Sequence, residues 1–142
     1  MLSARAATEC RPLQESIRFY GVTMNKEKSV YKKIKPLVRV SFVGKEKFFG
    51  KGIAELLELV DKYGTIQKAC KSMDMSYSKA WKIINRLEKE LGFKVLETKA
   101  GGKKGGESYL TDEAKDLLKR FSKMIKEVED YSEKSYKKYF LK

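Results

Sequence analysis

Five side chains between Tyr77 and Asn85 could recognise a nucleic acid from one face of a single helix. Hydrogen-bonding, stacking and charged groups recur there at helical spacing: Tyr77, Ser78, Trp81, Lys82 and Asn85. Base edges in the major groove of duplex DNA present distinct donors and acceptors, which such side chains distinguish. The spacing therefore predicts a helix that could read DNA with this face.

Trp81 leaves two alternatives open, and some of its neighbours have simpler roles. Because Trp81 lies at the edge of the apolar stripe, it either packs under the following loop or touches DNA. Tyr77 falls in the first turn, where recognition helices meet base edges and phosphates, so we expect a DNA contact. Arg86 and Lys89 are interpreted as solvent-exposed residues that pair with Glu90.

A glycine-rich loop follows, and its lysines could bind phosphates. Apolar arms at 95–98 and 108–110 enclose four glycines and carry the basic residues Lys99, Lys103 and Lys104. Glycine lets the backbone approach a groove closely, and lysine attracts a polyanion. The loop is therefore interpreted as a wing. A nucleotide-binding phosphate loop is the competing interpretation, but that motif ends in Gly-Lys-Ser/Thr and opens a helix rather than a strand.

Two helices joined by a short turn must position these side chains. The first begins after Thr65 and ends at Asp74, and the second begins at the N-cap Ser76 and ends at Gly92. Such a pair is typical of a helix-turn-helix. The amides at a helix start also hold phosphate, and the predicted DNA-binding set is completed at these starts by Thr65, Ser76 and Lys79.

A strand at 37–43 and a helix at 53–63 are predicted to brace the motif. Val38, Val40 and Phe42 alternate with Arg39 and Ser41, as in a half-buried strand. A lone hairpin is marginal in water, so we expect this strand to join the wing arms in one small antiparallel sheet. The fold class is then mainly α (α+β), a winged helix-turn-helix.

A long C-terminal helix is predicted from Thr111, which can cap its first turn, to about Tyr139. At 1.5 Å per residue this helix would measure roughly 40 Å, which is longer than so small a domain needs. Its apolar positions are expected to form a dimer seam that includes Phe121, Ile125, Val128 and Tyr131. A helix packed back on its own monomer is the alternative.

The charge balance favours an anionic partner and disfavours catalysis. The chain carries 32 Lys and Arg against 19 Asp and Glu, a formal charge of +13. It contains no histidine, which removes the usual general base and the commonest metal ligand, so we predict no enzyme, no metal and no cofactor. Two cysteines make no disulfide framework, and no apolar run reaches the roughly 18 residues of a membrane span. We expect a cytoplasmic protein without a membrane partner.

Three regions are predicted along the chain: an N-terminal extension at 1–35, a winged helix-turn-helix at 36–110 and a long helix at 111–142. Residues 1–23 hold three of the six arginines and none of the lysines, which marks a composition boundary. One hypothesis is that the native start is Met24. A genuine N-terminal arm is the alternative.

Three short motifs carry a resemblance to a known family. They are YGTI at 63–66, MSYSKAW at 75–81, and GGKKGG at 101–106 followed by Leu110 and Thr111. With these motifs, the span from roughly Leu37 to Tyr131 resembles the N-terminal winged-helix domain of the ModE family of molybdate-responsive regulators, which is itself similar to the DNA-binding domain of LysR-type regulators. The resemblance implies a homodimer, joined through its N-terminal and long C-terminal helices, that binds a palindromic operator with the second motif helix.

This chain departs from the family pattern in two places. The family wing often carries Arg and Thr where this chain has Thr98 and Ala100. Family members that sense molybdate carry C-terminal oxyanion-binding domains, whereas this sequence ends at Lys142, so no molybdate site is expected in it. The sequence therefore predicts a sequence-specific, duplex-DNA-binding transcriptional regulator that acts as a homodimer. The alternative is a winged-helix protein-interaction module whose basic face is incidental.

Overall fold

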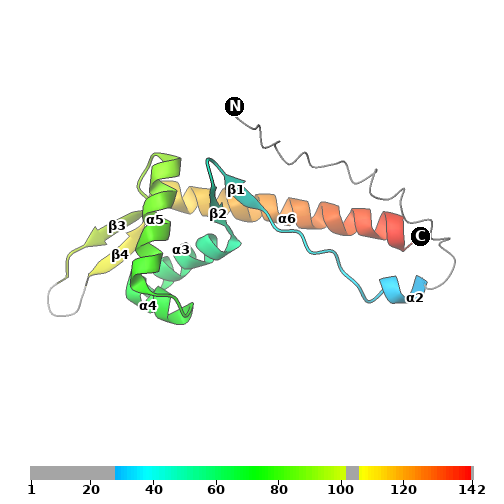
Figure 1. The fold of residues 1–142 in the computed structure, drawn as a ribbon, viewed down its shortest axis with the longest axis horizontal. Coiled ribbons are helices and arrows are strands. Elements are labelled where there is room, and N and C mark those ends of the chain that lie inside the picture. The colour runs from blue at the N-terminus through cyan, green and yellow to red at the C-terminus, as the bar shows by residue number, and fades with distance from the viewer. Residues whose placement is uncertain (1–27, 102–105, 142) are drawn as a thin grey trace, which may run out of the picture.

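A winged domain lies at one end of the molecule, and a long helix runs out of it (Figure 1). The computed structural model describes residues 28–101 and 106–141. Its elements in chain order are α2 (Lys28–Tyr31), β1 (Ser41–Val43), β2 (Lys47–Gly50), α3 (Lys51–Tyr63), α4 (Ile66–Ser72), α5 (Tyr77–Leu91), β3 (Leu96–Lys99), β4 (Glu107–Leu110) and α6 (Asp112–Phe140). This architecture is a winged helix-turn-helix, as the sequence predicts.

The ends of α4 and α5 follow from single residues in the sequence. The Thr65 hydroxyl accepts a hydrogen bond from the Lys68 amide at 3.2 Å. The Ser76 hydroxyl accepts one from the Lys79 amide at the same distance. Gly92 ends α5 with φ 76°, a left-handed conformation that glycine adopts without steric cost. The predicted caps at Ser76 and Gly92 are therefore confirmed.

The strands form two separate hairpins, so the prediction of one sheet is wrong. β1 pairs with β2 through Phe42 and Phe49, and β3 pairs with β4 from Leu96 opposite Leu110 to Lys99 opposite Glu107. The Gly44 amide donates to the Glu46 carbonyl at 3.0 Å, and this tight turn returns the chain to β1 directly. The strand predicted at 37–43 begins only at Ser41. Packing on the core supplies the support that a lone hairpin lacks.

The core lies between the helices and the two hairpins. Its largest fully buried side chains come from β2, α3, α5 and the residue before β3: Phe49, Leu56, Leu57, Val60, Ile84, Leu87 and Val95. α6 adds Ala114 and Phe121, so its first turns belong to the same core.

Phe121 therefore does not lie on a surface left exposed by the monomer, as the predicted dimer seam assumed. Its ring lies 4.8 Å from that of Phe49 and 5.4 Å from that of Phe42, edge to face, and only 5% of the residue is exposed. The β1–β2 hairpin brings Phe42 and Phe49 against α6, and the sequence pattern along α6 alone does not show that contact. Phe121 stabilises the domain itself.

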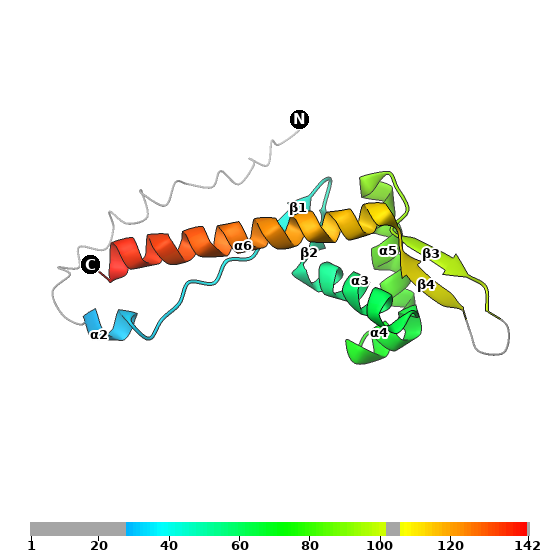
Figure 2. The ribbon, with the colours of Figure 1, turned by 180° about the vertical axis from the view of Figure 1, so that it is seen from behind.

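α6 continues beyond the core, with α2 near its far end, as Figure 2 shows from behind. The Thr111 hydroxyl accepts the Ala114 amide at 3.2 Å, so the predicted cap and the predicted length are confirmed. At the far end, the Tyr136 hydroxyl donates to the Tyr31 carbonyl at 2.9 Å, and the Tyr136 and Phe140 rings stack at 4.9 Å. Among the described residues, no helix is both long and apolar enough to cross a membrane.

Candidate nucleic-acid interface

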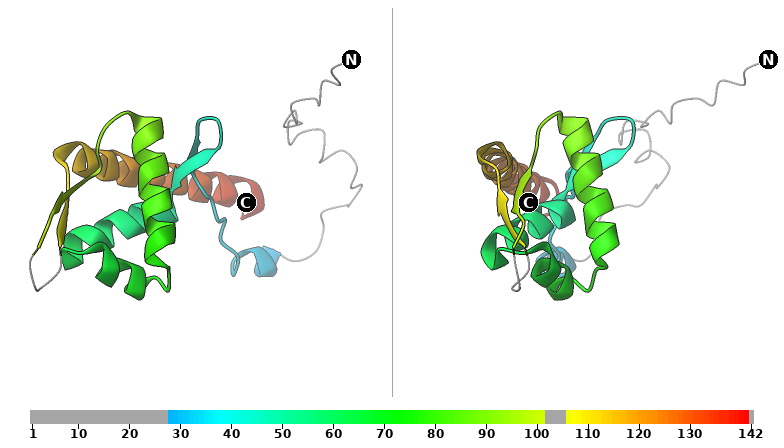
Figure 3. Two further views of the ribbon diagram at one scale, coloured as in Figure 1. Left: turned by 60° about the vertical axis from the view of Figure 1, so that its left-hand side comes forward. Right: turned by 90° about the vertical axis from the view of Figure 1, so that its left-hand side faces the viewer.

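α5 stands between the β3–β4 wing and the β1–β2 hairpin, with one long side open to solvent (Figure 3). Its buried side carries Ala80, Ile84 and Leu87. Ser78, Lys82 and Asn85 point the other way, because the same helical period that buries one face exposes the opposite one. Exposed side chains on α5 include Ser78, Lys79, Lys82 and Asn85.

Tyr77 and Trp81 form an aromatic pair at the edge of α5 nearest the wing. Their rings are edge to face, with centroids 6.2 Å apart. Trp81 is partly buried against the core, whereas 48% of Tyr77 is exposed. Both alternatives for Trp81 therefore retain support, because it packs inward and also borders the open groove beside the wing.

This wing-side groove is a hollow of about 430 Å³ between α4, α5 and the wing. Thr65, Tyr77, Trp81 and Lys99 line it, so four of the predicted residues come together here. Thr65 uses its oxygen as the cap of α4, and a hydroxyl that accepts one bond can still donate another to an anion.

The wing carries Lys99 at the end of β3, opposite Glu107. The Lys99 ammonium lies 5.9 Å from the centre of the Tyr109 ring, whose hydroxyl donates to the Glu107 carboxylate at 2.7 Å. This hydrogen bond to Glu107 raises the pKa of Tyr109 above its ordinary value. Lys103 and Lys104, the other predicted wing lysines, lie outside the described residues.

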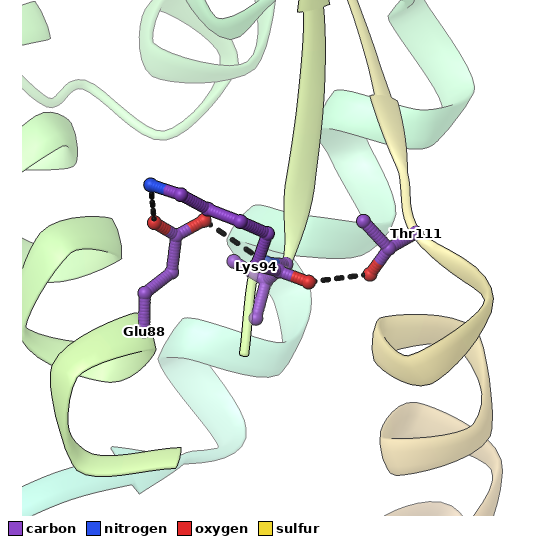
Figure 4. Close-up of polar contacts among 4 residues, drawn as sticks. Glu88, Lys94 and Thr111 are labelled. Carbon is purple, nitrogen blue, oxygen red and sulfur yellow. Dashed lines mark hydrogen bonds and ion pairs between the residues drawn. The ribbon is translucent and has the colours of Figure 1, made fainter. Parts of the chain in front are cut away.

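Glu88 connects α5 to the base of the wing, which sequence reasoning missed (Figure 4). One carboxylate oxygen accepts the Val95 amide at 2.9 Å, and the other accepts the Lys94 ammonium at 2.7 Å. The Thr111 hydroxyl donates to the Lys94 carbonyl at 2.7 Å, which extends the connection to α6. Glu88 lies seven residues before Val95, beyond helical spacing, so no periodic signal could have indicated this contact.

Arg86 corrects another expectation, because its ion pair is not with Glu90. Its guanidinium lies 3.4 Å from the carboxylate of Glu46 in the turn of the β1–β2 hairpin. Across the described ranges, no group of three His, Cys, Asp or Glu side chains could hold a metal ion.

The segment that contains α4, α5 and the wing is similar to known DNA-binding proteins. Residues 54–115 match the family model described as the bacterial regulatory helix-turn-helix protein, lysR family. These residues form a LysR-type helix-turn-helix domain. The LysR-type domain runs from the first turn of α3 into the first turn of α6, so it contains α4, α5 and the wing.

The chain is also similar to a curated regulator. The transcriptional regulator ModE of Haemophilus influenzae is 35% identical to it over 66 residues. That alignment covers 46% of this chain and 26% of the ModE protein, so the chain matches about a quarter of that relative's length. The resemblance to a ModE-like, LysR-related domain is confirmed for the matched segment.

Proposed function

We propose that this protein is a transcriptional regulator that binds duplex DNA sequence-specifically with α5 in the major groove. The observation that carries the proposal is the open polar side of α5, held between two hairpins in a LysR-type domain. An α-helix about 10–12 Å across fits a groove about 12 Å wide, so such a side can reach base edges. A bacterial regulator of this type meets chromosomal DNA in the cytoplasm, so we propose that location for the protein.

The interface divides into reading and positioning residues. Tyr77, Ser78 and Lys82 lie in the first two turns of α5, where a recognition helix meets base edges. Lys99 and the other wing lysines would bind phosphates, which adds affinity without reading sequence. Glu88 would act as a positioning residue, since it fixes the wing against α5.

We further propose a homodimer formed through α6 beyond the core. Tyr131 is 73% exposed on this part of the helix, and Val128 is partly buried. Nearer the domain, Leu118 and Ile125 pack on the core and also line a hollow of about 610 Å³ between α3 and α6, so apolar surface continues along the helix from the core toward the proposed seam. A two-fold dimer would bind a palindromic operator with half-sites about one helical turn, or a multiple of it, apart.

Titration of labelled duplexes by fluorescence anisotropy tests the function. A DNA-binding regulator should bind every duplex with an affinity that falls steeply with salt, and a subset of sequences should bind roughly 10³-fold tighter or more. Absence of duplex binding at 50 mM salt would contradict the proposal and favour a protein-interaction module.

A further inference from the structure

We propose that the β1–β2 hairpin and α5 form a second phosphate clamp, on the flank of α5 opposite the wing. The clamp would hold the DNA strand that the wing does not reach. This inference rests on the proposed function, because it assigns new contacts to the same DNA complex.

Basic side chains from two elements meet on this flank. A hollow of about 160 Å³ opens between β2 and α5, over an apolar floor of Phe48, Ile53 and Ile83. Four cationic residues line it, one from the hairpin and three from the helix: Lys47, Lys79, Lys82 and Arg86. In the described part of the chain, no acidic side chain forms an ion pair with Lys47, Lys79 or Lys82.

The hairpin is fixed in place, so Lys47 is not carried on a loose loop. Phe42 and Phe49 pack in the aromatic cluster with Phe121, with the Phe42 and Phe49 rings 5.5 Å apart. At the turn, a Cβ added to Gly44 would collide with the carboxylate of Glu90 on α5, so the backbone passes close to the helix. The Glu46–Arg86 ion pair makes a second connection there.

The position of the hollow matches the geometry of a groove complex. A helix in the major groove has a phosphate backbone on each side, because its diameter of about 10–12 Å nearly fills the width of about 12 Å. Lys99 and Thr65 lie on the wing flank. Lys47, Lys79 and Arg86 lie on the other flank, where the second backbone would pass.

Two variants test the clamp through effects of opposite sign. Lys47→Gln removes a phosphate contact. The negative slope of log K against log salt should therefore become shallower by about 0.9, and binding at 0.1 M salt should be about fivefold to tenfold weaker. Glu46→Gln removes a repelling carboxylate and frees Arg86, so it should strengthen binding severalfold. Both residues are exposed, so neither substitution should unfold the domain.

Lys123→Gln is the matched control, since Lys123 is exposed on α6 and does not line this hollow, so its loss should leave the slope unchanged. The ranking of duplex sequences should stay the same in Lys47→Gln, because phosphates carry no sequence code. Wild-type binding by both hairpin variants, with a reduced slope in Lys99→Ala, would overturn the clamp and leave the proposed function standing.

Two further results would also overturn it. A wild-type protein that binds no duplex would remove both the clamp and the proposed function. Stabilisation of the DNA-free protein by inorganic phosphate that is lost in Lys47→Gln, together with an unchanged salt dependence of DNA binding in that variant, would assign the hollow to a free anion instead.

Discussion

At the scale of single residues, Glu88 has the clearest structural task. Its carboxylate satisfies the amide of Val95, a fully buried residue, and at the same time holds Lys94. The ion pair itself adds little, because 79% of the Lys94 side chain is exposed. The hydrogen bond from the Val95 amide therefore accounts for most of what Glu88 contributes to the free energy of unfolding.

Glu88→Ala should therefore destabilise the domain by about 1–3 kcal/mol, because it leaves a buried amide without an acceptor. Glu88→Gln retains an acceptor oxygen and should cost less than about 1 kcal/mol. Urea titration followed by circular dichroism measures both. Equal losses in the two variants would show that the charge, and not the hydrogen bond, matters.

Phe121 gives a second test at this scale. Phe121→Ala should cost about 3–5 kcal/mol, since it opens a cavity beside Phe42 and Phe49. Lys119→Ala, at an exposed position of the same helix, is the control and should cost far less. Thermal or urea unfolding that is equally affected by both changes would place Phe121 outside the core.

At the scale of elements, the success of sequence reasoning depended on the distance along the chain between the interacting residues. The caps at Ser76 and Thr111 each use an amide three residues away, so a short pattern contains the whole interaction. The contacts of Phe121 with Phe42 and Phe49 join segments far apart in the sequence, and the pattern along the helix could not show them. The assignment of β1 to the wing sheet failed for another reason: β1 pairs across a tight turn with the next segment, Lys47–Gly50, for which no strand was predicted.

The same limit applied to the candidate site. Helical period was enough to place Ser78, Lys82 and Asn85 on the open side of α5. The contacts of Glu88 with β3 and of Arg86 with Glu46 join different elements, and no local pattern predicts them.

The wing should contribute charge and not sequence preference. Replacing Lys99, Lys103 and Lys104 together with alanine should weaken binding to all duplexes and reduce the salt slope by up to about 2.7, at about 0.9 for each lost phosphate contact. Anisotropy titrations between 50 and 200 mM salt report the slope. An unchanged slope in the triple variant would place the wing away from the DNA.

At the scale of the whole molecule, the part of α6 beyond the core should join two chains. Changing Val128 and Tyr131 to aspartate should place charges in the seam and split the dimer, while the winged domain keeps its fold. Sedimentation measures the mass, and circular dichroism checks the fold. A wild-type monomer at micromolar concentration, or a double variant that stays dimeric, would refute this arrangement.

Selection of bound sequences from a randomised duplex library tests the reading of DNA by α5 most directly. The wild-type protein should enrich a motif with two half-sites about one helical turn, or a multiple of it, apart. Alanine at Tyr77, Ser78 or Lys82 should change the preferred base at particular positions, by about 1–3 kcal/mol in the ranking of sites. No enriched motif, or the same motif in all three variants, would contradict the assignment of α5 as the reading helix.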